Sequence, residues 1–182
     1  VLWEDDLERL QGLWARYKDV DGDGIPYRTV VGNRHPRAAY FTRGTGHNEN
    51  ARYTEDSQVW HDSLIRLKKK YDQAGQYVPE PIVENSPEAE IGLIFFGSTE
   101  PAVFEARAHL SQQGLFSDSL RIRAIPFSDR VGEFIRRHKR NYVIEMNRDG
   151  QLHQLLSLEY PDHVASLKSL AYTDGLPLTA SF

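Results

Sequence analysis

The sequence predicts an α/β protein with a mostly parallel sheet covered by helices, preceded by an irregular helical arm. From residue 88 onward, strand-like and helix-like stretches alternate, which is typical of parallel strands joined by helical crossovers. One of these stretches, Ile91–Phe96, is a near-continuous apolar run, as expected for a strand covered on both faces. The 40% share of hydrophobic residues is enough for a sizeable core and argues against wholesale disorder.

Residues 1–87 are polar and irregular. Leucines recur at helical spacing in residues 2–17 and predict an amphipathic helix there. A dense turn signal follows at 19–26. Between 33 and 53 the chain is rich in Gly, His, Arg and Tyr, and only 38–41 resembles a strand. A long, weakly periodic stretch of this kind is either functional or packed on something else.

A second helix is predicted over 54–76, with Thr54 as its cap. Prolines at 79 and 81 end this helix, and the residues up to Pro87 read as a linker. The apolar stripe expected on the helix consists of Trp60, Leu64, Leu67 and Tyr71.

The second half of the chain alternates strands and helices, with Ser98 and Ser128 placed to cap the helices that follow them. The expected elements are, in order, strand 91–96, helix 100–113, strand 120–125, helix 129–139, strand 142–146, helix 152–158 and strand 167–172.

Charge and composition exclude several classes of function. The 22 Lys and Arg against 26 Asp and Glu give a net charge of −4, which argues against nucleic acid as a partner. The chain contains no Cys, so disulfides, Cys-ligated zinc or iron–sulfur clusters and a Cys nucleophile are excluded. No apolar run approaches the roughly 18 residues that span a bilayer, and no signal peptide is visible. We therefore expect a cytoplasmic protein with no membrane partner, and the first residue, Val1, suggests a piece of a longer chain.

The acidic turn resembles two cofactor motifs. Asp19, Asp21 and Asp23 match the first half of a calcium loop, but its twelfth position is Val30 rather than Glu. Gly22–Gly24 with the distant Asn50 imitates the thiamine diphosphate signature, but no buried strand precedes the turn and no helix follows it. An acidic turn with solvated carboxylates explains both matches, so no metal ligand is assigned.

Two polar loops are the strongest candidates for contacting a ligand or a partner subunit. The first, 42–49, contains two glycines that allow close backbone approach, and the second, 145–152, follows the end of a predicted strand. The alternative for each is a turn whose polar groups satisfy its own backbone. The candidate residues are Arg43, Thr45, His47, Asn48, Glu49, Asn147, Arg148, Gly150 and Gln151.

Two interpretations are open for the basic runs Lys68–Lys70 and Arg136–Arg140. Each run is either part of a solvent-exposed helix face or a site that binds an acidic partner.

Six motifs in order carry a family resemblance that extends from about residue 15 to the end of the chain. They are residues 21–28, 35–36, 39–49, 125–127, 145–156 and 174–179. Together they resemble the C-terminal part of the alpha subunit of 2-oxoacid:ferredoxin oxidoreductases, particularly the 2-oxoglutarate type.

The resemblance implies a function for the complete enzyme: oxidative decarboxylation of a 2-oxoacid to an acyl-CoA, with electrons passed to ferredoxin. Thiamine diphosphate, magnesium and iron–sulfur clusters take part in that enzyme, with coenzyme A as co-substrate. Residues 1–87 would be the end of the pyrimidine-binding core domain and an inter-domain arm. Residues 88–182 would be a domain similar to the transketolase C-terminal domain.

The resemblance assigns no catalytic residue to this chain. In the family, the diphosphate and magnesium site belongs to the beta subunit, and the cluster cysteines and substrate contacts lie elsewhere. We therefore expect a fragment that binds no cofactor, is inactive alone, and serves scaffold and interface roles against the beta subunit. Two alternatives stay open: a stand-alone interaction module of the same fold, and a calcium-binding module built on the acidic turn.

Overall fold

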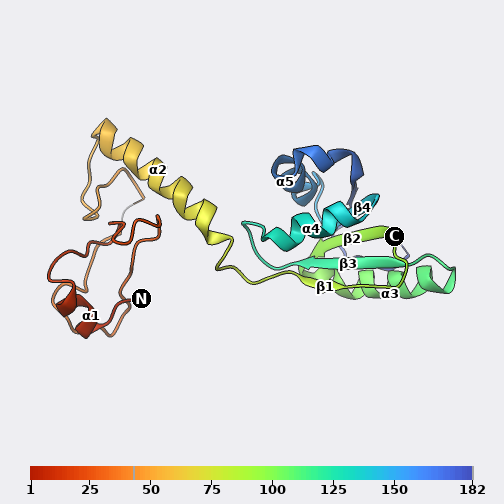
Figure 1. Ribbon diagram of the computed structural model, residues 1–182, viewed down its shortest axis with the longest axis horizontal. Helices are drawn as coiled ribbons and strands as arrows, with labels where there is room; N and C mark the ends of the chain where they lie inside the picture. The colour runs from red at the N-terminus through yellow and green to blue at the C-terminus, as the bar shows by residue number, and fades with distance from the viewer. Residues whose placement is uncertain (43, 182) are drawn as a thin grey trace. The chain divides into compact units, whose positions relative to one another are not determined.

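The computed structural model describes residues 1–42 and 44–181, in which the chain forms two compact units (Figure 1). Unit 1 is Val1–Ala74 and unit 2 is Gly75–Phe182. Arg43, one of the candidate loop residues, lies outside the described residues. Within the described residues, no helix combines the length and the apolar character needed to cross a membrane.

Unit 2 contains a five-stranded sheet in the order β1-β3-β2-β4-β5. All neighbouring strands are parallel except β1, which pairs antiparallel with β3 at one edge. The predicted α/β class with a mostly parallel sheet is therefore confirmed. The strands are β1 Ile82–Glu84, β2 Ile91–Phe96, β3 Ser117–Ile122, β4 Arg140–Glu145 and β5 Leu167–Ala171.

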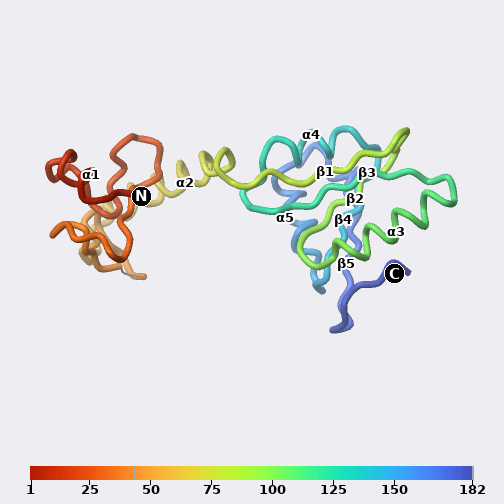
Figure 2. Tube along the Cα trace, turned by 90° about the horizontal axis from the view of Figure 1, so that it is seen from below, coloured from red at the N-terminus to blue at the C-terminus, as the bar shows by residue number. Residues whose placement is uncertain are grey.

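Helices cover both faces of this sheet, because alternate residues of each central strand point to opposite faces. On one face α4 (Asp129–Arg137) and α5 (Gln151–Glu159) pack on the strands, and on the other lies α3 (Glu100–Gln112) (Figure 1). Short 3₁₀ turns at Gly97–Thr99 and Pro161–Ser166 precede α3 and β5. After β5 the chain turns back toward the α3 side (Figure 2). The larger core cluster consists of Ile94, Leu120, Ile122, Val131, Phe134, Ile135, Val143, Leu152, Leu156 and Leu167.

Two strands of unit 2 differ from the prediction. The segment expected as a linker contains β1, whose three residues gain their partners only by pairing with β3. Strand β3 begins at Ser117 rather than 120, since its polar start is buried and hydrogen-bonded: Asp118 accepts bonds from Ser86 N at 2.7 Å and from Arg137 at 2.8 Å. Polar residues at a strand's start were read as loop, but tertiary partners satisfy them.

Unit 1 is built mainly from turns, and it has a small core. Its helices are α1 (Glu4–Arg9) and α2 (Ser57–Ala74). Leu2, Leu7 and Ala38 form its buried apolar cluster. The helix predicted over 2–17 ends at Arg9, because Gln11 and Gly12 take left-handed backbone conformations that turn the chain. The strand predicted at 38–41 is absent from the described residues there.

The predicted helix caps are also corrected. Asp56, not Thr54, caps α2, since its Oδ1 accepts bonds from the Gln58 and Val59 amides at 2.9 Å. Ser128 occupies the cap position of α4, but its hydroxyl donates to Glu80 Oε2 at 2.6 Å. Ser98 lies inside the 3₁₀ turn, and no side-chain cap closes α3 at Thr99.

Candidate interface loops and pockets

The first candidate loop is held by its own polar groups. His47 and Tyr53 form an isolated antiparallel bridge. Between them, Asn48 Oδ1 accepts bonds from the backbone amides of Asn50 at 3.0 Å and Arg52 at 3.1 Å. Asn48 therefore shapes the turn, and its carbonyl oxygen is already engaged within the loop.

The same loop packs on the segment that precedes the acidic turn. The His47 ring lies edge-on to the Tyr17 ring, with 4.0 Å between centroids, and His47 Nδ1 lies 3.1 Å from the Thr45 carbonyl. The Tyr17 amide donates to the Glu49 carbonyl at 2.9 Å. These contacts place Asn48 and Glu49 beside α2.

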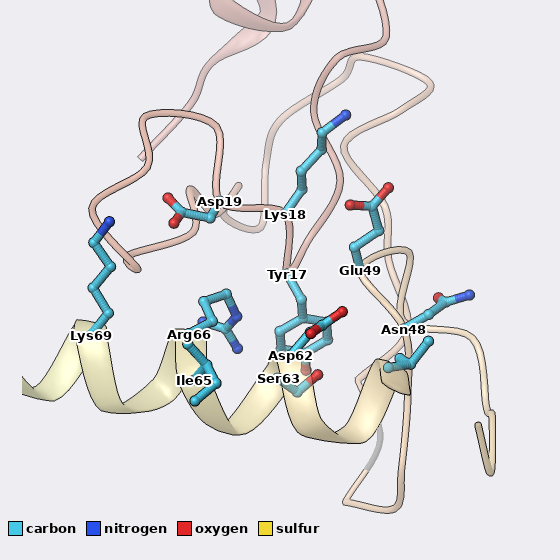
Figure 3. A pocket seen from close by; sticks show the side chains of 11 residues that line it. Tyr17, Lys18, Asp19, Asn48, Glu49, Asp62, Ser63, Ile65, Arg66 and Lys69 are labelled. Atoms are coloured by element: carbon cyan, nitrogen blue, oxygen red, sulfur yellow. The ribbon is translucent and has the colours of Figure 1, made fainter. Parts of the chain in front are cut away.

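A pocket of about 560 Å³ opens between these segments and α2 (Figure 3). We call it the α2 pocket, and a volume of this size is typical of small-molecule sites. It is lined by Tyr17, Lys18, Asp19, Asn48, Glu49, Val59, Asp62, Ser63, Ile65, Arg66 and Lys69. Of the nine candidate residues, Asn48 and Glu49 reach it.

Arg66 joins α2 to the acidic turn at this pocket. Its Nη1 donates to the Gly24 carbonyl at 3.2 Å. Partial burial lowers the pKa of Arg66, and the neighbouring Arg16 lowers it further, while Asp19 opposes the shift. Arginine is not deprotonated in proteins, so Arg66 remains a cation at this pocket.

Two buried polar atoms near Arg66 have no hydrogen-bond partner among the described residues. They are Nε of Arg16 and Oδ1 of Asp19. Oδ2 of Asp19 accepts the Gly24 amide at 2.9 Å, and the Arg16 guanidinium lies over the rings of Tyr17 and Tyr40 at 4.8 and 5.3 Å. One donor and one acceptor are left for an ordered water or a polar ligand group.

The acidic turn does not fit either cofactor that its sequence imitates. Asp21 accepts the Tyr27 hydroxyl, and Asp23 accepts the Ile25 amide at 2.8 Å. A Cβ added to Gly24 would lie 2.6 Å from the Lys70 backbone nitrogen, so the turn packs directly on α2 and has no room for a diphosphate there. Among the described residues, no three His, Asp or Glu side chains gather as a metal-binding set.

One face of helix α2 lies toward the rest of unit 1. Its half-buried residues include Val59, Ser63 and Arg66, which share the face over the pocket, and none of its residues is fully buried. The predicted apolar stripe lies about 110° around the helix from this face and is exposed in unit 1. We call this stripe the α2 seam: Trp60 (59% exposed), Leu64 (48%), Leu67 (47%) and Tyr71 (52%).

In unit 2, the second candidate loop is organised by Glu145. This carboxylate is fully buried at the end of β4. Its Oε2 accepts Asn147 Nδ2 at 2.6 Å and the Leu152 amide at 2.7 Å, and its Oε1 accepts the His153 amide at 3.0 Å. Glu145 thereby caps the first turn of α5, where backbone N–H groups otherwise lack partners.

The other candidate residues of this loop form the turn that leads from Glu145 into α5, or lie exposed on it. Asn147 Oδ1 accepts the Gln151 amide at 3.1 Å, and Gly150 adopts the left-handed conformation with φ +63°. Arg148 is exposed and pairs with Asp149, which raises the pKa of Arg148. Helix α5 therefore begins at Gln151, one residue before the predicted start at 152, after a turn that Asn147 and Gly150 form.

A second pocket, of about 580 Å³, lies at the carboxyl edge of β2 and β3, where ligands bind in open α/β sheets. Gln151 is the candidate residue that reaches it. Its other lining residues are Phe96, Gly97, Ile122, Arg123, Ala124, Ile125, Leu152 and Leu155.

Sequence reasoning missed two features of these sites. Glu145 was placed in the loop range but not among the candidate residues, because a buried carboxylate resembles any other glutamate in sequence. Arg66 and Asp19 were not connected, since they are 47 positions apart. One signal was present in the sequence: over 63–70, polar residues such as Ser63 and Arg66 alternate with leucines of the apolar stripe, and this pattern indicates a helix with two different faces.

Comparisons with known proteins add to this geometry. The chain is 28% identical over 148 residues to subunit alpha of 2-oxoacid:ferredoxin oxidoreductase 2 from Aeropyrum pernix, covering 79% of this chain and 22% of that one. It also matches a 2-oxoglutarate:ferredoxin oxidoreductase structure from Magnetococcus marinus, solved with 2-oxoglutarate, coenzyme A and succinyl-CoA bound. That match has a TM-score of 0.70 and 26% identity over 94% of this chain and 29% of that one. No protein-family model matches.

The chain thus spans less than a third of the length of the proteins it matches. Similarity in sequence and in fold covers most of the chain and points in both cases to the same class of enzyme. The homologues described above are therefore 2-oxoacid:ferredoxin oxidoreductases, and the relative from Aeropyrum pernix is an alpha subunit.

Proposed function

We propose that this chain is the C-terminal part of the alpha subunit of a thiamine diphosphate-dependent 2-oxoacid:ferredoxin oxidoreductase of the 2-oxoglutarate type. The complete enzyme converts a 2-oxoacid to an acyl-CoA in the cytoplasm and reduces ferredoxin. The observation that carries the proposal is the structural match over 94% of this chain at a TM-score of 0.70.

In this proposal the chain supplies scaffold and interface rather than catalysis. Thiamine diphosphate, magnesium and the iron–sulfur clusters are held by other parts of the enzyme, and thiamine diphosphate supplies carbanion stabilisation there. The engaged acidic turn and the absence of Cys support this division. Residues 1–87 complete a pyrimidine-binding core domain and its arm, and 88–182 form a transketolase C-terminal-like domain.

The two candidate loops hold the interface with the beta subunit and between domains. Internal hydrogen bonds fix the backbones of both loops. Little conformational entropy of the loop backbone is therefore lost when side chains such as Glu49 and Arg148 bind a partner. Thr45 and Gly46 line a further pocket beside Trp60, which extends this surface in unit 1.

The test is reconstitution of the complete alpha subunit with the beta subunit. We expect reduction of a viologen dye that requires coenzyme A, thiamine diphosphate and a 2-oxoacid, with 2-oxoglutarate preferred over pyruvate. The double variant His47→Ala/Glu49→Ala should co-purify less beta subunit and leave the KM for the oxoacid of the assembled enzyme unchanged. His109→Ala, on an exposed position of α3, is the matched control.

Two results contradict the proposal. The first is oxoacid-dependent dye reduction by the 182-residue chain alone, which would place catalysis inside it. The second is an assembled complex that shows no dependence on any 2-oxoacid.

A further inference from the structure

A buried histidine at the amino edge of the sheet has an acceptor atom at each ring nitrogen. His138 follows the last residue of α4, and its side chain is 2% exposed. Its Nε2 lies 3.0 Å from Oδ2 of Asp118 at the start of β3, and its Nδ1 lies 2.9 Å from the Phe134 carbonyl oxygen. Only the doubly protonated ring donates from both nitrogens. We propose that the folded chain holds His138 as a buried imidazolium, and that its proton is a pH-sensitive latch between α4 and the start of β3.

The carboxylate of Asp118 receives three donors. Its Oδ1 accepts the Ser86 amide at 2.7 Å, and its Oδ2 accepts Arg137 Nη2 at 2.8 Å as well as the ring. Both oxygens are thus engaged as acceptors, so the proton between Asp118 and His138 comes from the ring. Arg137 also donates to Oδ1 of Asn85 at 2.7 Å. The cluster therefore ties the end of α4 and the segment after β1 to the start of β3.

The end of α4 supplies the second acceptor. The His138 amide donates to the Ile135 carbonyl at 3.4 Å, so the Phe134 carbonyl receives the ring rather than that amide. Carbonyls in the last turn of a helix lack intrahelical partners, and the helix dipole places partial negative charge there. A positive charge on the ring is therefore favoured at this position.

Strands β2 and β4 face the ring with Gly92 and Asn141, which carry no charge. A Cβ on Gly92 would lie 3.0 Å from His138 Nδ1 and 2.4 Å from Asn141 Oδ1. That amide oxygen is buried and has no hydrogen-bond partner among the described residues, so it adds partial negative charge close to the ring. The like charge at this site is Arg137 of α4 itself, which is half exposed and shares Asp118 with the ring.

Loss of the ring proton breaks this arrangement. A neutral imidazole donates from one nitrogen only, so its other nitrogen would turn a lone pair toward Asp118 or toward the Phe134 carbonyl. Either contact sets two buried acceptors against each other, which is destabilising. A histidine in an unfolded chain loses its proton at about pH 6.5, so above that pH the folded chain holds a proton that the unfolded chain does not. The free energy of unfolding therefore falls as the pH rises, and the latch opens.

The test is nitrogen-15 NMR of the histidine rings in the 182-residue chain, since the shifts of the two ring nitrogens report which of them carry protons. At about pH 7.5 we expect both nitrogens of His138 to be protonated and the ring of His109, exposed on α3, to be mostly neutral. The second readout is amide exchange at Ser86, which donates to Asp118. Its protection factor, corrected for the pH dependence of exchange itself, should fall at least about tenfold between about pH 6 and 9.

Variants assign the effect to the latch. Asp118→Asn keeps the shape of the side chain and removes its charge, so His138 should carry a single proton at about pH 7.5. His138→Gln removes the titrating group, and Ser86 protection should then change by less than about threefold over the same pH range. Arg137→Gln removes the like charge and should leave His138 doubly protonated. His109→Gln is the matched control, and its Ser86 amide should behave as in the unsubstituted chain.

Three outcomes would overturn the inference. They are a single proton on the His138 ring at neutral pH in the unsubstituted chain, two protons on it in Asp118→Asn as well, and the same pH dependence of Ser86 protection in His138→Gln as in the unsubstituted chain. The first measurement needs no variant, so a variant that fails to fold leaves the test intact. The inference does not rest on the proposed enzyme function, and its failure would leave that function untouched.

Discussion

The two units of this chain are stabilised in different ways. Unit 2 buries ten apolar residues in one cluster and four in another on the opposite face of its sheet. Unit 1 buries three apolar residues in its cluster and carries an 18-residue helix with none of its side chains fully buried. Its turns are closed by backbone amides that donate hydrogen bonds to the side-chain oxygens of residues such as Asp19, Asn48 and Asp56.

This difference indicates which unit has enough buried apolar area to be stable as an independent domain. Burial of apolar area is the dominant favourable term in folding, whereas a hydrogen bond contributes about 1 kcal/mol after exchange with water. Unit 2 therefore has the core of an independent domain. Unit 1 has a much smaller apolar core, and its α2 seam stays about half exposed.

The largest expected effect is in the unit 2 core. Phe134→Ala removes a ring that is 2% exposed and should destabilise unit 2 by about 3–5 kcal/mol. Leu64→Ala in the α2 seam should change the stability of unit 1 by less than about 0.5 kcal/mol, because the side chain is half exposed. Native-state hydrogen exchange of amides in β2 and α2 measures both. A large loss from Leu64→Ala would show that unit 1 buries the seam itself.

The second effect compares the polar residues that organise the two loops. Glu145→Ala leaves the buried amide of Leu152 without its acceptor and should cost about 2–3 kcal/mol in unit 2. Asn48→Ala removes acceptors from exposed amides, which water can satisfy, and should cost about 1 kcal/mol or less. Urea denaturation followed by α5 amide exchange tests the first value. Equal losses of unfolding free energy in the two variants would contradict the claim that burial makes the Glu145 hydrogen bonds the more important ones.

A third test separates backbone strain from packing in unit 1. Gly22 and Gly24 have similar left-handed φ values of +73° and +83°, but only Gly24 packs on α2. Both alanine variants carry the conformational cost of about 1 kcal/mol, and Gly24→Ala should add at least about 1 kcal/mol more from the clash with Lys70. The measurement is amide exchange across α2. If the two variants behave alike, the acidic turn does not anchor this helix.

The smallest effect is a pH dependence at Tyr160, a half-buried residue of unit 2. Burial, with help from Glu159 and Asp129, raises the pKa of Tyr160 from 10.0 to about 12. Because the neutral phenol is favoured in the folded state, its contribution is present below pH 10 and is lost as the pH rises through 12. Tyr160→Phe should lose less stability between pH 10 and 12 than the unsubstituted chain, as measured by urea midpoints. Parallel curves for the two proteins would mean that Tyr160 is solvated.

The sequence predicted unit 2 well and unit 1 poorly. The strand at 91–96 and the helices near 100, 129 and 151 were found because their apolar spacing reflects burial in a sheet covered on both faces. In unit 1, the helix expected over 2–17 is cut to six residues and the strand at 38–41 is absent. The turn at Gln11 and Gly12 ends this helix. Residues in turns show no regular apolar spacing, so the sequence pattern does not reveal where such a turn occurs.

The sequence by itself determined the α/β class, the order of elements in unit 2, the family resemblance and the absence of Cys ligands, since local periodicity and residue types encode these directly. The tertiary structure alone decided that β1 joins the sheet, that Glu145 holds the second loop, and which face of α2 meets the rest of unit 1. The pairing of β1 and the contacts of α2 join groups distant in sequence, and the contacts of Glu145 depend on the burial of its carboxylate, which only the folded chain provides.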